Sequence, residues 1–382
     1  MNLALRRAGI GAVYGDPIDR LDVVRTPTAS LAKLLADTHR AITGVPALVS
    51  VDGSLQRPDG SPVVLDNVAS SEVVDEFDES VIDPVRSAER AMVLAGPGVV
   101  SAGAVPGLHA LAAAGRLGVI NTWGAKGVFD WRSQHHLATA GLQARDFDLA
   151  GLPESDLVIA TGIDPDEAPL ALWSSQPHVV VEPMQLDALS EHVIQRGDWA
   201  PVPELRTRLA AVTQDGWADI GSPAAPSAVT RNYGAIFGNG GRVAADPGQG
   251  GFWTARTFST VELGSARVPG RSIPGFAAAA ALVTRLTQPH RPVLAVVDAV
   301  SPETEGIVDI ANGLGAGFSI EVWTVGGDAL SAGQHLDRLQ RLAFVERCEV
   351  VTLTTAGWQL DRIVDAAGPV IAWGGLAVSY QG

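Results

Sequence analysis

The most constraining feature of this sequence is the alternation of strand-like and helix-like segments across Val93–Pro169. A run reading MVLAGPGVV ends in glycines and leads into GAVPGLHALAAAGRL, which has the apolar spacing of a helix. A second strand follows in GVINTWGAKGVF, and a third in LPESDLVIATGIDPDEAP. Strands that alternate with helices favour a doubly wound parallel sheet, because parallel neighbours need a crossover connection.

The same alternation restarts near residue 229 and continues to the C-terminus. GRVAADPG, VLAVVDAV, SIEVWTV and EVVTLTT are typical of strands, with helix-like segments between them. The stretch IGSPAAPSA, which precedes this region, has the composition of an interdomain linker. We therefore expect a second α/β domain in the C-terminal part of the chain.

The N-terminal part predicts a smaller α/β unit built around one amphipathic helix. Ser30 is the expected N-cap of this helix and Gly44 its stop signal. Its apolar face is formed by Leu31, Leu34, Leu35 and Ala41. The acidic stretch VASSEVVDEFDESVIDP follows, and we interpret it as a solvated linker or surface helix. The predicted domains are residues 1–90, 91–220 and 221–382.

Composition excludes several classes of function. The 382-residue chain has a net charge of −15 and no Lys/Arg cluster, so nucleic acid and anionic membranes are unfavourable partners. The single cysteine, Cys348, excludes a disulfide framework and is expected to be a buried structural thiol. The N-terminus lacks the long apolar core of a signal peptide, and the longest apolar run, Phe276–Val283, is too short to span a bilayer. We expect a soluble cytoplasmic protein.

The central segment resembles the central domain of thiamine-diphosphate enzymes of the acetolactate synthase type. That family has a strand ending in GxGV, then T-x-x-G-K-G-x-F, then a strand reading D-L-V-I-x-x-G. The corresponding residues here are Gly96–Val99, Thr122–Phe129 and Asp156–Gly162. The resemblance implies three doubly wound parallel-sheet domains in the arrangement of these enzymes: a shortened pyrimidine-binding-like domain, a central Rossmann-like domain and a diphosphate-binding-like domain.

The C-terminal region carries weaker matches to the same family. Asp246–Gln249 resembles a D-x-G-Q segment, Trp253–Arg256 resembles the W-A-A segment after it, and Arg271–Phe276 resembles the turn before an alanine-rich helix. The resemblance implies that Gln249, Ser272, Gly275 and Asp298 lie near thiamine diphosphate, with Asp298 as a ligand of Mg2+. It also implies a homodimer or homotetramer, because the family binds its cofactor at a subunit interface.

The departures from the family pattern suggest impaired or lost catalysis. The family's G-D-G motif is replaced by Val297-Asp298-Ala299, and Thr324 stands where an asparagine ligand is expected. Ala29 stands at the position of the glutamate that activates the cofactor, so we assign no catalytic residue. We expect a binding or scaffold role. A heteromer in which a catalytic paralogue supplies the missing glutamate would restore function.

Two other functions stay open. The chain could be an active 2-oxoacid decarboxylase or carboligase in which Asp298 still holds Mg2+. It could also be a nucleotide-binding regulatory protein that uses the turn Gly96–Gly103, although this turn lacks a full G-x-G-x-x-G. The pair His135-His136 is interpreted as a polar loop rather than a metal site. We expect Trp123, Trp253 and Trp323 to be core or interface residues.

Overall fold

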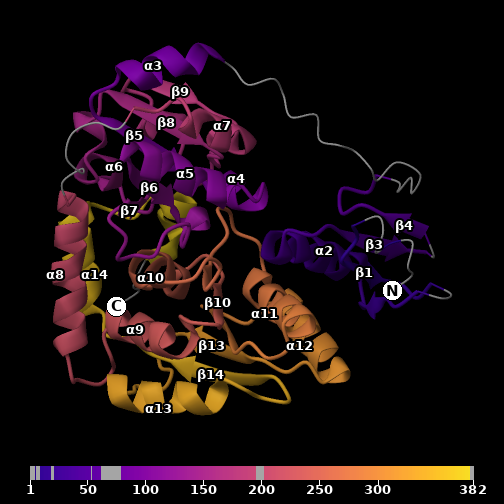
Figure 1. Cartoon of the computed structure of the whole chain (residues 1–382). Helices are drawn as coiled ribbons and strands as arrows, with labels where there is room; N and C mark the ends of the chain where they lie inside the picture. The colour runs from indigo at the N-terminus through magenta and orange to yellow at the C-terminus, as the bar shows by residue number, and fades with distance from the viewer. Residues whose placement is uncertain are drawn as a thin grey trace.

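The computed structural model describes residues 5, 9–18, 21–52, 54–61, 79–194 and 202–378. Three β-sheets follow one another along the chain, and each lies within one of the three expected segments. Figure 1 shows the central sheet and its helices above the C-terminal ones, with the N-terminal unit beside the helices α11 and α12. Residues 68–78, which are most of the acidic stretch expected as a solvated linker or surface helix, lie outside the described residues.

The central sheet is entirely parallel, with the strand order β7-β6-β5-β8-β9. Its strands are β5 (Ala91–Ala95), β6 (Gly118–Thr122), β7 (His136–Ala140), β8 (Leu157–Thr161) and β9 (His178–Val180). The helices are α3 (Ile82–Ser87), α4 (Pro97–Ser101), α5 (Val105–Gly115), α6 (Asp146–Leu149) and α7 (Leu186–Ser190). The central strands are buried on both faces, as a sheet covered by helices on both sides requires. The loop predicted at His135-His136 is wrong for His136, which is the first residue of β7.

The C-terminal sheet is also parallel, with the order β11-β10-β12-β13-β14. Its strands are β10 (Arg242–Ala245), β11 (Ala266–Arg267), β12 (Val293–Val297), β13 (Ser319–Trp323) and β14 (Glu349–Leu353). The helices of this region are α8 (Glu204–Ala218), α9 (Pro226–Phe237), α10 (Gln249–Thr257), α11 (Phe276–Thr287), α12 (Pro302–Leu314), α13 (Ala332–Leu342) and α14 (Trp358–Ala367). Cys348 lies half-buried just before β14.

The predicted linker IGSPAAPSA is wrong over its second half. Ala224 and Ala225 are fully buried in the core of the C-terminal domain, and Pro226 is the first residue of α9. Proline is favoured at a first helical position because the N–H it lacks would have no helical partner there. Small residues that suit a linker therefore also suit a closely packed helix start.

The N-terminal sheet has the order β2-β1-β3-β4, in which only β4 is antiparallel. Its strands are β1 (Ala12–Gly15), β2 (Val24–Arg25), β3 (Ala47–Val51) and β4 (Ser54–Gln56), and its helix is α2 (Ala29–Thr43). The N-cap of α2 is Thr28, whose hydroxyl accepts a hydrogen bond from the N–H of Leu31 at 3.2 Å, so the prediction of Ser30 is wrong. Gly44 ends the helix with a left-handed φ of 72°, as predicted. Leu31 and Leu35 are buried and Leu34 partly so, but Ala41 is exposed.

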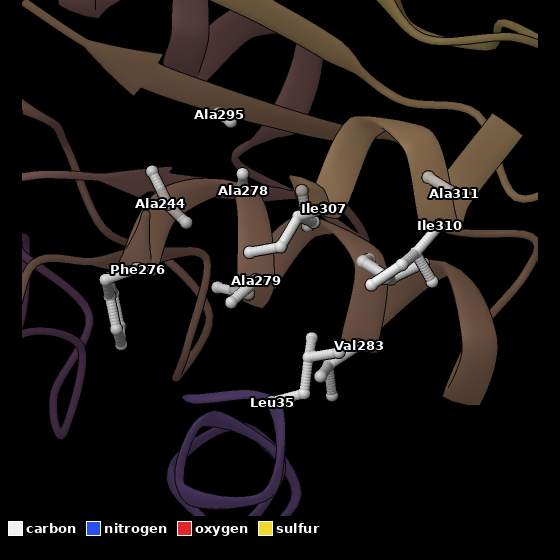
Figure 2. Close-up of a cluster of buried hydrophobic side chains, with 14 of the residues drawn as sticks. Leu35, Ala244, Phe276, Ala278, Ala279, Val283, Ala295, Ile307, Ile310 and Ala311 are labelled. Atoms are coloured by element: carbon white, nitrogen blue, oxygen red, sulfur yellow. The ribbon is translucent and has the colours of Figure 1, made fainter. Parts of the chain in front are cut away.

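The N-terminal unit is attached to the C-terminal domain through the alanine-rich helix α11. From Phe276 to Thr284 every residue of α11 is buried. Figure 2 shows Leu35 of α2 beside Val283, with Ala279 and Ile307 further into the same cluster. Alanine permits this because it lets the backbones of α2 and α11 approach closely. Within the part of the chain that is described, no helix has the length and apolar character to cross a membrane.

Candidate functional site

The predicted metal ligand Asp298 follows β12 directly and closes the start of α10. Its carboxylate accepts hydrogen bonds from the backbone N–H of Gln249 at 2.5 Å and of Gly250 at 3.0 Å. Burial raises the pKa of the Asp298 carboxyl, and these two N–H groups oppose the rise. A Cβ atom at Gly248 would lie 2.3 Å from the carboxylate, so this approach requires glycine. The Asp298 carboxylate therefore caps the N-terminal end of α10, where a negative charge is stabilising.

A second carboxylate, Asp246, directly follows β10 and caps the N-terminal end of α11. Its Oδ1 accepts a hydrogen bond from the N–H of Ala277 at 2.7 Å. Burial raises the pKa of Asp246 to about 6, and the charge of Asp298 adds to the rise. The two carboxylates therefore interact across the same edge of the sheet.

The other predicted cofactor residues are only partly brought together. Gln249 is joined to Asp298 through its backbone, and its side-chain amide lies 3.3 Å from the hydroxyl of Thr355. Gly275 precedes α11 with a left-handed φ of 77°, and a Cβ atom there would lie 2.8 Å from the Cβ of Glu303. Ser272 is exposed in the loop before α11.

In the helix α12, which follows Asp298, one N–H group of the first turn is likewise satisfied by the chain. The Ser301 hydroxyl accepts a hydrogen bond from the N–H of Thr304 at 3.1 Å. Thr324, which stands at the asparagine position, is exposed after β13. Among the described residues, no group of three or more His, Cys, Asp or Glu side chains could hold a metal ion. Magnesium prefers six oxygen ligands, so Asp298 as it stands does not complete a site, and its role as a metal ligand stays a prediction.

The glycine-rich turn after β5 is shaped by close packing. The N–H of Gly96 donates to the carbonyl of Thr161, and the N–H of Gly98 donates to that of Gly162. A Cβ atom at Gly96 would lie 2.3 Å from the carbonyl oxygen of Gly162. Glycine is therefore needed where the chain after β5 approaches the chain after β8. The N–H groups of Gly96 and Gly98 already donate to backbone carbonyls, so they are not available to a ligand.

The central and C-terminal domains meet at Trp123, which the sequence analysis expected to be a core or interface residue, and at Glu167, which it did not single out. Trp123 is 2% exposed and donates from Nε1 to the carbonyl of Pro269 at 3.3 Å. Glu167 accepts a hydrogen bond from the N–H of Gly124 at 2.9 Å, and burial raises its pKa to about 7. Trp253 and Trp323 are buried in the C-terminal core, so the prediction of three core or interface tryptophans is confirmed.

Lys126 is the most unusual residue that sequence reasoning missed. It follows β6 within the T-x-x-G-K-G-x-F segment and is 8% exposed. Burial and the nearby charge of Arg256 lower the pKa of its ammonium to about 7. One sequence signal could have drawn attention to it, because Lys33 and Lys126 are the only lysines of the chain.

Comparisons with known proteins agree with this fold. Residues 79–194 match the sequence model of a family described as thiamine pyrophosphate enzyme, central domain. The whole chain is similar in fold to a protein from Mycobacterium smegmatis described as "a putative thiamin diphosphate-dependent enzyme", with a TM-score of 0.70 and 15% sequence identity. The similarity covers 92% of this chain and 98% of that one, and at such identity it establishes the fold alone. No curated protein sequence matches the chain.

The three α/β domains define a protein with the fold of thiamine-diphosphate enzymes. Within this fold, residues 79–194 match the model of the thiamine pyrophosphate enzyme central domain. The family resemblance found in the sequence and the predicted fold class are therefore confirmed. Thiamine diphosphate is accordingly the first cofactor to test on this chain.

Proposed function

We propose that this chain is a thiamine-diphosphate-enzyme homologue with impaired or lost catalysis that serves as a binding or scaffold protein. The observation that carries this proposal is the position of Asp298, whose carboxylate takes the N–H groups of Gln249 and Gly250 at the start of α10. Those N–H groups are the donors that a helix start could offer to a phosphate. In this chain the Asp298 carboxylate occupies the position that such a phosphate would take.

Three substitutions relative to the family pattern support the same proposal. Val297 and Ala299 flank Asp298 where the resembled family has glycines, and Val297 is the buried last residue of β12. Ala29, the first residue of α2, is exposed and offers no carboxyl group to a cofactor. Chemistry of this type depends on preorganised donors and acceptors, so several changes at one cleft weaken it together.

An active thiamine-diphosphate-dependent 2-oxoacid decarboxylase or carboligase is the second candidate. It is favoured by the closeness of Asp246 to Asp298: burial is the main cause of the raised pKa of Asp246, and the charge of Asp298 adds to it. A bound Mg2+ would relieve the repulsion between these carboxylates. The nucleotide-binding alternative has less support, because Gly96 and Gly98 direct their N–H groups to the chain's own carbonyls.

Thermal unfolding with thiamine diphosphate, with and without Mg2+, distinguishes the first two candidates. A ligand at a hundred times its dissociation constant adds about 2.7 kcal/mol to stability. Our proposal expects no Mg2+-dependent shift. A shift in the wild-type chain that is absent from Asp298→Ala would refute it. Because each shift is taken relative to the same variant without ligand, the loss of the helix cap in Asp298→Ala does not affect the comparison.

A scaffold role also predicts an assembly. We expect a homodimer or homotetramer, or a heteromer with a catalytic paralogue that supplies the glutamate absent at Ala29. Light scattering on the purified chain of 39.6 kDa measures the homo-oligomer directly. A mass that stays at one chain across concentrations would rule out the homo-oligomer.

A further inference from the structure

A pocket of about 220 Å³ lies between the edge strand β7, the helix α8 and the C-terminal end of α10. Thus it is bounded by parts of the central domain and of the C-terminal region. None of the predicted cofactor residues lines this pocket.

The ionised side chains that line this pocket, Lys126, Arg206 and Arg256, are all cationic. Lys126 is more than nine-tenths buried, and no described residue forms a hydrogen bond or ion pair with its ammonium. Arg206 donates to the backbone carbonyls of His136 at 3.0 Å and Trp131 at 3.1 Å, which carry no charge to neutralise it. Burial and the charges of Lys126 and Arg206 lower the pKa of His136 to about 3, so His136 is neutral.

The carboxylates near the pocket are already bonded to other groups. Arg256 forms an ion pair with Asp146 at 2.5 Å, and both side chains are fully buried. Asp130 is bonded to the exposed side chain of Arg132 at 2.6 Å. Lys126 and Arg206 therefore remain without a carboxylate partner in a chain whose net charge is −15. Burying a cation without an anion is costly, so an anionic ligand is the partner that these residues lack.

The remaining walls determine what kind of anion fits. The lining includes the apolar side chains of Trp131, Leu137, Leu209, Trp217 and Phe258. A cavity of about 150 Å³ can hold benzene. The present volume of about 220 Å³ therefore suits benzene with one small polar group, and a nucleotide is too large.

We propose that this pocket binds a small organic carboxylate with an apolar body, close to benzoate in size. The carboxylate pairs with Lys126 and Arg206, and the apolar body packs against the two tryptophans that line the pocket. This inference adds a ligand class to the proposed binding role, but it depends on a different pocket. Either proposal can fail while the other stands, because thiamine diphosphate tests one and benzoate the other.

Calorimetric titration with benzoate tests the proposal directly. Benzamide is the matched neutral ligand, and Lys33→Met is the matched control for Lys126→Met. We expect benzoate to bind the wild-type chain and Lys33→Met alike. We expect binding at least about tenfold weaker for benzamide and for Lys126→Met, because a charge-assisted hydrogen bond is lost in each case. Equal binding of benzoate and benzamide, or equal binding by both variants, would overturn the proposal.

A measurement on the wild-type chain covers the case in which a variant fails to fold. Limited acylation with an amine-reactive reagent modifies the two lysines, and peptide mass spectrometry reports each of them. Benzoate should slow the acylation of Lys126 and leave that of Lys33, which is exposed, unchanged. No protection at millimolar benzoate, or equal protection by inorganic phosphate, would contradict the inferred ligand class.

Discussion

Replacing Lys126 by methionine should stabilise the ligand-free protein, although it removes a binding group. Burial and Arg256 lower the pKa of the Lys126 ammonium from 10.5 to about 7. That difference corresponds to about 4–5 kcal/mol of less favourable protonation in the folded state. Methionine keeps an unbranched stem and carries no charge. We therefore expect the free energy of unfolding at neutral pH to rise by on the order of 2–4 kcal/mol.

The sign of the pH dependence provides a second check of the same reasoning. Between pH 7 and 10.5 the unfolded chain binds more protons at Lys126 than the folded chain, so wild-type stability rises with pH in this window. The advantage of Lys126→Met should be full below about pH 7 and vanish near pH 10.5. Urea unfolding followed by tryptophan fluorescence measures it, with Lys33→Met as the control. A Lys126→Met midpoint no higher than that of Lys33→Met at neutral pH would refute the reasoning.

Three further predictions concern buried carboxylates. Asp146→Asn should lower the free energy of unfolding, measured with urea, by about 3–5 kcal/mol, because the Arg256 guanidinium loses its charged partner. The double variant Asp146→Leu with Arg256→Met should recover most of this loss, because neither charge is then left buried alone. Burial raises the pKa of Glu167 from 4.5 to about 7, so its contribution to stability is full below pH 4.5 and is lost as the pH rises through about 7. Glu167→Gln should make the urea midpoint fall less across this window, and an unchanged pH profile would contradict the assignment. Asp298→Ala should cost about 1–2 kcal/mol through loss of the α10 cap, measured as a lower midpoint than that of the wild-type chain.

The central domain was the part of the fold most accessible from sequence. Strands β5 and β8 are buried on both faces, so the sequence shows them as continuous apolar runs, and a glycine, Gly96 or Gly162, follows each at the same sheet edge. Local sequence signals were less decisive where more than one residue could cap a helix or where one composition suits both a linker and a core. Thr28 and Ser30 are both good caps by residue type, and the structure has Thr28, whose hydroxyl accepts a hydrogen bond from the N–H of Leu31. Ala224 and Ala225 suit a linker as well as a core, and burial decides between them.

Of the candidate sites, the position of Asp298 could be predicted from the sequence, and the cationic pocket could not. Asp298 could be placed at the sheet edge because it follows an apolar strand, but its bond to the start of α10 depends on a contact across 49 residues of sequence. The cationic pocket had no comparable signal. Lys126, Arg206 and Arg256 come from three separate segments, and tertiary packing alone brings them together. Spacing rules describe one helix or one strand at a time, so they cannot detect such a set.

The position of Asp298 also bounds how well the cleft could bind a diphosphate. A diphosphate that used the N–H groups of Gln249 and Gly250 would have to displace a carboxylate that is already bonded to both. The displaced carboxylate is mostly buried, and leaving it without donors costs about 1–3 kcal/mol, or roughly ten- to a hundredfold in affinity. A Mg2+ ion could offset this cost only by taking Asp298 as a ligand, together with further oxygen atoms from the cofactor and from water. Cofactor affinity should therefore depend more steeply on Mg2+ here than in a cleft where the helix start is free.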